Sequence, residues 1–289
     1  MNTKELIKKV RKIEIKTKGL TSQIFSGEYH SAFKGKGMAF SEVREYAIGD
    51  EIRTIDWNVT ARFNEPFVKV FEEERELTVM LIVDISPSGL FGTKNQLKRE
   101  TITELCAVLA FSASSNKDRI GVILFSDQVE KYIPPKKGKS HILQIIRTLL
   151  NAESKGKSTN IEVALQFLSK IQKKKATVFL LSDFKSSDYS SALKIVSRKH
   201  DLIALKFSDQ AEYHLPKIGL AKFKDLESGK NVWINTNSKK ARVNYEIHQK
   251  NFDTHVKQNF RKLNIDFAEL DTNSDYIKPL MNLFDRRSK

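Results

Sequence analysis

The sequence predicts an α/β protein built on a Rossmann-like, doubly wound, mostly parallel sheet, and three observations support this fold class. Two segments, residues 78–83 and 177–181, are apolar or β-branched without a polar break, as strands buried on both faces are. Each segment is followed closely by an aspartate, Asp84 or Asp183. Strand-like and helix-like segments alternate from residue 78 onward, which is typical of parallel sheets covered by helices on both faces.

The order of the expected elements follows from the period of the apolar residues. Before the sheet we expect an amphipathic helix over residues 1–25, a short helix capped by Asp56, and an edge strand over 66–71. Residues 217–236 are expected to form a hairpin that turns at 227–229, followed by a polar helix through Phe252 and Phe260. The sheet region is expected to contain strands at 78–83, 119–126, 128–134, 176–184, 201–209 and 264–272, and helices at 96–114, 140–150, 158–172, 190–200 and 274–287.

This pattern divides the chain into a collar (residues 1–76), a sheet domain (77–208 and 264–289) and an insertion into the sheet domain (209–263). The collar is rich in charges of both signs, so we expect it to be connected by salt bridges and to pack against the sheet domain. The alternative is that the collar is a docking surface for a partner. Its candidate contact residues are then Arg44, Arg53 and Trp57.

The composition of the 289 residues bounds the possible functions. The formal net charge of +15 leaves open a basic protein that binds nucleic acid or an anionic membrane surface. We favour a solvated surface, because 37 of the 50 basic residues are lysines spread along the whole chain, and arginine is better suited to bidentate phosphate contacts.

The single cysteine, Cys106, lies in an apolar helical stretch and is expected to be a buried hydrophobic residue. No segment approaches the roughly 20 apolar residues of a membrane span, and residues 1–20 lack an apolar signal region, so a cytoplasmic protein is expected.

The functional prediction starts from oxygen-bearing side chains that follow the buried strands. Asp84 ends the first strand, and Ser86 and Ser88 follow at alternate positions, which point the same way in an extended loop. Asp183 follows the second strand, and Thr159 opens a helix after a loop with glycine and lysine residues. Each could serve only as a helix cap, but at the carboxyl edge of an open α/β sheet they would converge where ligands bind. Together they form an oxygen ligand set suited to Mg²⁺ or to another divalent cation such as Mn²⁺.

The charge of this ligand set predicts what else it binds. Two carboxylates and three hydroxyls leave a divalent cation able to accept one more acidic ligand. A glutamate or aspartate of a partner protein would supply it, and Lys155 and Lys157 would steer such a partner toward the crevice. We therefore expect a metal-dependent protein-interaction module.

The same residues resemble a known site. The pattern Asp84-x-Ser86-x-Ser88, with the later Thr159 and Asp183, resembles the metal-ion-dependent adhesion site (MIDAS) of von Willebrand factor A domains. The chain departs from that pattern at two positions, neither of which removes a ligand. Pro87 stands where glycine is frequent, and Asn160 stands where aspartate is common.

Residues 35–88 resemble the segment that marks the bacterial domain-of-unknown-function 58 family, and the resemblance extends from about Gly27 to Arg287. The resemblance implies a Rossmann-like sheet of the von Willebrand A type with the metal site at its top. It also implies that the protein acts with a MoxR-type AAA+ ATPase in protein maturation or stress tolerance.

No enzymatic motif competes strongly with this prediction. Gly156-Lys157-Ser158 looks like the end of a phosphate-binding P-loop, but Asn151 stands where the first glycine belongs. The chain has neither the G-x-S-x-G pattern of serine hydrolases nor the H-E-x-x-H zinc pattern. We expect a non-enzyme. The alternative is a hydrolase whose cation activates water, which would need a general base near the ion.

Overall fold

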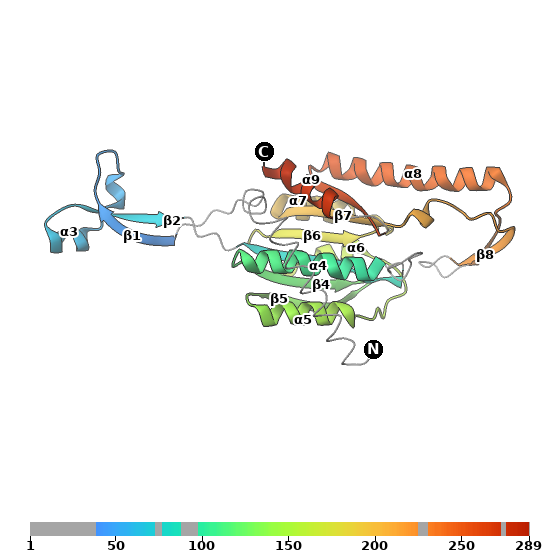
Figure 1. Cartoon of the computed structure of the whole chain (residues 1–289), viewed down its shortest axis with the longest axis horizontal. Helices are drawn as coiled ribbons and strands as arrows, with labels where there is room; N and C mark the ends of the chain where they lie inside the picture. Colours follow the sequence, from blue (N-terminus) through green and yellow to red (C-terminus); the bar gives the residue numbers. More distant parts are fainter. Residues whose placement is uncertain (1–38, 73–76, 88–97, 225–230, 273–275, 289) are drawn as a thin grey trace. The chain divides into compact units, whose positions relative to one another are not determined.

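A computed structural model describes residues 39–72, 77–87, 98–224, 231–272 and 276–288 (Figure 1). The helix expected over residues 1–25 and the hairpin turn at 227–229 lie outside the described residues. The chain divides into a small compact unit, Lys34–Leu77, and a larger unit that contains Thr78–Lys289.

The small unit consists of an antiparallel strand pair joined by two short helices. Strand β1 (Ala39–Glu45) pairs with β2 (Phe67–Glu72), and between them lie the 3-10 helix η1 (Ile52–Thr54) and α3 (Trp57–Phe63). The Asp56 side chain caps α3 by accepting hydrogen bonds from the N–H groups of Asn58 and Val59. The predicted cap and edge strand are thus confirmed.

Salt bridges hold this unit together, as the charge pattern predicted. The two Nη atoms of Arg44 each lie 2.7 Å from an oxygen of Asp50, and this contact lowers the pKa of the Asp50 carboxyl. Val68 is buried, whereas the side chain of Trp57 is 67% exposed. That the collar packs against the sheet domain stays a prediction.

The larger unit is built on a six-stranded sheet with the order β10-β7-β6-β3-β4-β5. All neighbouring strands are parallel except β4 and β5 at one edge, which confirms the mostly parallel sheet. The strands are β3 (Thr78–Asp84), β4 (Arg119–Phe125), β5 (Val129–Lys136), β6 (Thr177–Ser182), β7 (Asp201–Ser208) and β10 (Asp266–Asp271).

The strand order reverses between β3 and β6. From β3 the sheet grows through β4 to β5 on one side, and the chain then returns to add β6, β7 and β10 on the other side. Strands β3 and β6 are parallel neighbours, with Val83 opposite Leu181. Ligands of open α/β sheets bind outside the carboxyl ends of the strands at such a reversal. The aspartates predicted as ligands follow these two strands.

Helices cover both faces of the sheet. On one face, α6 (Ile161–Ile171), α7 (Ser190–Lys199) and the last turns of α8 (Lys239–Lys262) share a core cluster with Met80 and Leu180. The helices of the other face are α4 (Lys98–Ser115), α5 (Lys139–Leu150) and α9 (Ile277–Ser288). Phe284 of α9 meets Phe179 of β6 edge-on, with 6.5 Å between ring centroids. Cys106 of α4 is fully buried, as predicted.

The segment predicted as an insertion begins with the 3-10 helix η3 (Gln210–Glu212). The hairpin strands β8 (Leu220–Lys224) and β9 (Asn231–Asn235) and the long helix α8 (Lys239–Lys262) follow. Val256 and Phe260, near the end of α8, belong to the core of the sheet domain. In the part of the chain that the structure describes, no helix combines the length and apolar character needed to cross a membrane.

Candidate metal centre

Asp84, at the end of β3, is buried, and both of its carboxylate oxygens are held. Oδ1 accepts a hydrogen bond from the backbone N–H of Ser86 at 2.9 Å, and the Ser86 hydroxyl also bonds this carboxylate. Oδ2 accepts from the hydroxyl of Ser182 on β6 at 2.6 Å. The Ser182 oxygen in turn accepts from the N–H of Phe184 at 3.0 Å. Asp84 is thereby fixed against the loop that carries Asp183.

Asp183 lies directly after β6 and is also buried. Its Oδ1 accepts from the N–H of Lys185 at 3.1 Å, in a tight turn at which Phe184 adopts a left-handed φ of 63°. Such a conformation is uncommon for a bulky residue and is found preferentially at functional sites. Oδ2 is buried and has no hydrogen-bond partner among the described residues. A buried carboxylate oxygen is rarely left so, and a bound cation would satisfy it.

Thr159 reaches the same edge of the sheet from the loop before α6, and it is buried. The helix cap is its neighbour Asn160, whose side chain accepts from the first turn of α6. Ser186 connects this loop to the one after β6. Its hydroxyl donates to the carbonyl of Thr159 and accepts from the N–H of Ile161, both at 3.1 Å. The cap function is therefore taken by Asn160, and the hydroxyl of Thr159 is not needed for it.

The electrostatics of the site also fit a cation. The pKa of Asp84 is raised to about 7, first by burial and then by the negative charge of Asp183. Two buried carboxylates that repel one another are stabilised by a divalent ion between them. In the described ranges no group of three or more His, Cys, Asp and Glu residues is placed to hold a metal ion, and the candidate donors at this site are two carboxylates and hydroxyls. That donor set suits Mg²⁺, which keeps several of its waters.

The predicted steering lysines lie on the loop over residues 152–158. Its backbone is held by residues after β4: Oε1 of Glu130 accepts from the N–H groups of Lys155 at 2.9 Å and Gly156 at 3.0 Å. Oδ2 of Asp127 accepts from the N–H of Lys157 at 3.1 Å. Both lysine side chains are exposed. The loop is thus fixed while its charges face solvent, next to Thr159.

Apart from the two lysines, the structure sorts the predicted site residues into three groups. Asp84, Ser86 and Asp183 come together at the carboxyl ends of β3 and β6, and Thr159 is connected to this edge through Ser186. Ser88 lies outside the described residues. The candidate collar contacts Arg44, Arg53 and Trp57 belong to the small unit.

Three residues of the centre were missed in the sequence: Ser182, Lys98 and Glu212. The signal for Ser182 is its place next to Asp183 at a strand end. Lys98 lies four residues before Ile102 on the apolar face of its helix, so it had to point inward. Glu212 has no such signal, because nothing in its neighbourhood along the chain distinguishes it from a surface residue.

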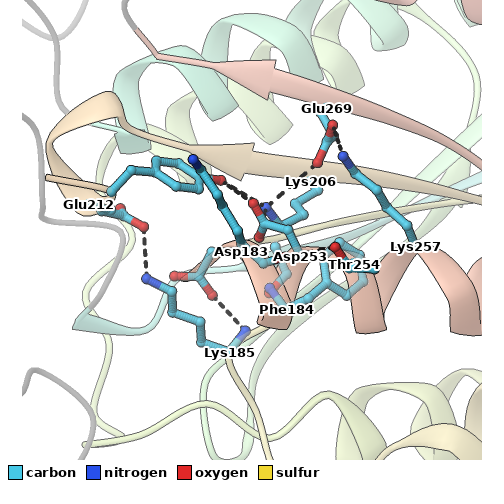
Figure 2. A network of polar contacts seen from close by, with 12 residues as sticks. Asp183, Phe184, Lys185, Lys206, Glu212, Asp253, Thr254, Lys257 and Glu269 are labelled. Carbon is cyan, nitrogen blue, oxygen red and sulfur yellow. Dashed lines mark hydrogen bonds and ion pairs between the residues drawn. The ribbon is translucent and has the colours of Figure 1, made fainter. Parts of the chain in front are cut away.

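Glu212 connects the centre to α8 through η3. It pairs with Lys98 and, at 2.8 Å, with Lys185 (Figure 2). The next residue, Tyr213, donates to Asp253 of α8 at 2.6 Å. Asp253 also pairs with the buried Lys206 of β7 at 2.8 Å. Adjacent residues of one short segment thus contact both the candidate metal centre and a long helix.

Comparison with known proteins agrees with this architecture. The family model "Protein of unknown function DUF58" matches residues 42–255. An uncharacterized protein of Mycobacterium bovis is 28% identical over 224 residues, which cover 76% of this chain and 70% of that protein. An aerotolerance-related membrane protein from Bacteroides fragilis aligns with a TM-score of 0.51 and 15% identity, over 73% of this chain and 98% of the other. The conserved hypothetical protein BatB from Bacteroides thetaiotaomicron aligns with a TM-score of 0.50 and 14% identity, over the same shares. The resemblance to the domain-of-unknown-function 58 family and the expected doubly wound α/β fold are both confirmed.

Proposed function

The chain belongs to the DUF58 family, and from this premise and the geometry at the β3 and β6 strand ends we propose that it is a metal-dependent protein-interaction module with a MIDAS-type site. Its ligands are Asp84, Ser86, Ser88, Thr159 and Asp183, and its cation is Mg²⁺ or a similar divalent ion. The site binds an acidic side chain of a partner protein.

One observation supports the proposal above the others: the buried Oδ2 of Asp183, which accepts no hydrogen bond among the described residues, lies beside Asp84 with its raised pKa. A site that served only to hold the fold together would have both carboxylates satisfied by protein donors. Here one oxygen lacks a hydrogen bond and the other carboxylate is destabilised as an anion. A divalent cation would relieve both features at once.

The charges around the site explain why the ligand should be acidic. Asp84, Asp183 and Glu212 are three carboxylates, and Lys98 and Lys185 are two ammonium groups connected to them. When all are ionised they leave one net negative charge. When bound, a divalent cation supplies two positive charges and an open coordination position, so the centre becomes net positive. The exposed Lys155 and Lys157 then add to the attraction for a carboxylate.

We propose a MoxR-type AAA+ ATPase as the partner, or as the machine that brings a client to this site, in protein maturation or stress tolerance. This step depends on the family resemblance drawn from the sequence. The proposal includes a cytoplasmic location and binding of the partner without chemical turnover.

The test is surface plasmon resonance with the full chain immobilised and a MoxR-type ATPase as analyte, in Mg²⁺ and then in EDTA. Thr159→Ala should weaken capture in Mg²⁺, as EDTA does for the wild type. The matched control is Thr254→Ala, which removes an exposed threonine hydroxyl of α8 far along the chain from the ligands. Equal affinity in the two buffers would show that the interaction surface lies elsewhere, and the proposal would fail.

A further inference from the structure

Lys98 is a charged residue in an unusual place. Its side chain is 2% exposed, and its ammonium group lies between two carboxylates, Glu212 and Asp183. Burying an ammonium group is costly unless partners offset the lost hydration. A lysine kept here against that cost places an ammonium group at the edge of the candidate metal centre.

The two carboxylates do not hold this ammonium equally. Glu212 makes a direct ion pair with it, whereas Oδ2 of Asp183 lies 3.6 Å from Nζ and makes no hydrogen bond. Glu212 holds a second ammonium, that of Lys185, on its other oxygen at 2.8 Å. Figure 2 shows the contact between Glu212 and Lys185, with Asp183 labelled nearby. Glu212 therefore draws Lys98 toward η3 and leaves the buried Oδ2 of Asp183 without a hydrogen bond, so that this oxygen can still bind a metal ion.

We propose that Lys98 is an internal cation that competes with the metal ion for Asp183, and that Glu212 sets the outcome by holding the ammonium away. This rests on the proposed function, because it concerns the same site. Lys98 is a positioning residue here: it lowers the intrinsic affinity for the divalent ion and keeps the two aspartates compatible when no ion is bound.

The argument from charge gives the direction for each partner. Removing the Lys98 charge removes repulsion between an ammonium and a divalent ion that share one carboxylate. Removing the Glu212 charge does the opposite, because it releases the ammonium toward Asp183 and subtracts a negative charge from the centre. Lys185 offers the matched comparison. It pairs with the same Glu212 but is 33% exposed in its side chain, and water screens its charge.

The experiment titrates Mn²⁺ alone, by calorimetry, into the full-length wild type and its variants. Lys98→Met, which keeps most of the side-chain length and leaves Glu212 paired with Lys185, should bind Mn²⁺ at least roughly tenfold more tightly. Glu212→Gln should bind at least roughly tenfold more weakly. Lys185→Met should change the affinity less than Lys98→Met. Lys98→Arg, which keeps the charge, should stay near the wild type, and Glu212→Gln covers the case in which Lys98→Met fails to fold.

A second readout separates competition from a structural role. In EDTA, Lys98→Met should unfold at lower temperature than the wild type, and saturating Mn²⁺ should raise its unfolding temperature by more than it raises that of the wild type. Equal Mn²⁺ affinity in the wild type, Lys98→Met and Lys98→Arg would overturn the competition while leaving the metal site in place. Equal effects of Lys98→Met and Lys185→Met would also overturn it, because general electrostatics would then suffice. Mn²⁺ binding that is absent from every variant, or unchanged in Asp84→Ala, would refute the proposed function itself.

Discussion

Replacing Asp84 by asparagine tests the electrostatics of the centre without a metal. The new side chain would keep the acceptor for the N–H of Ser86, and its amide could donate to the Ser182 hydroxyl, which has acceptor capacity. The substitution removes the charge that burial and Asp183 destabilise. We therefore expect Asp84→Asn to stabilise the metal-free protein at neutral pH.

The magnitude follows from the pKa of Asp84, which is about 7 in the folded protein and about 3.9 in an unfolded chain. At pH values between these two pKa values, folded Asp84 holds a proton that unfolded Asp84 has lost. The free energy of unfolding of the wild type therefore falls as the pH rises from about 4 to about 7. A difference of about three pKa units at 1.36 kcal/mol each corresponds to roughly 4 kcal/mol. The advantage of Asp84→Asn should thus be near zero at pH 4 and largest above pH 7.

The assay is urea unfolding from pH 4 to pH 8 in EDTA. The matched control is Asp188→Asn, because exposed Asp188 caps the N–H of Ser190 at 2.9 Å and asparagine can do the same. That control should show no gain that grows with pH. In saturating Mg²⁺ the order should reverse, since only the wild type gains the free energy of ion binding. A stability difference between wild type and Asp84→Asn that stays flat from pH 4 to pH 8 would refute the reasoning.

Three further outcomes are expected. Gly156→Ala should loosen the loop before Thr159, because a Cβ there would overlap the Asp127 carboxylate. Calorimetry should find weaker Mg²⁺ binding, and the free energy of unfolding should fall by about 1–3 kcal/mol. Unchanged binding would show that the loop does not position the ligand. Tyr213→Phe should lower the free energy of unfolding by about 1 kcal/mol, because Asp253 loses a half-buried hydrogen-bond donor, and chemical denaturation measures this. No loss would mean that water replaces the hydroxyl. Deleting residues 1–76 should give insoluble or molten protein if the collar packs on the sheet domain, and a sharp, reversible thermal transition of the truncated chain would instead identify the collar as an independent docking element.

Most of the fold could be predicted from the sequence, because the burial of each strand is visible in its own run of apolar residues. An uninterrupted apolar run such as residues 78–83 predicts a strand buried on both faces, and all of Val79 to Val83 are fully buried. The register with β6 then follows from parallel pairing of two such runs. Asp84 and Asp183, which end the runs, had to meet at one edge of the sheet. For the same reason Asp56 could be identified as a helix cap, since a cap acts on N–H groups two and three residues away.

The sequence by itself therefore determined the strands, the sheet class and the position of the two aspartates at the strand ends, because each depends on neighbours within a few residues. Only the tertiary structure decided what surrounds those aspartates. Ser182 bonds Asp84, which lies 98 residues earlier in the chain. Lys98 of α4 pairs with Glu212 of η3, although four strands separate the two elements in the sequence. The sequence around a charged residue on a helix or after a strand does not indicate which residue will pair with it. The path of the backbone decides the partner. The pair becomes buried, and so has a large effect on stability, only when the helices pack over the sheet.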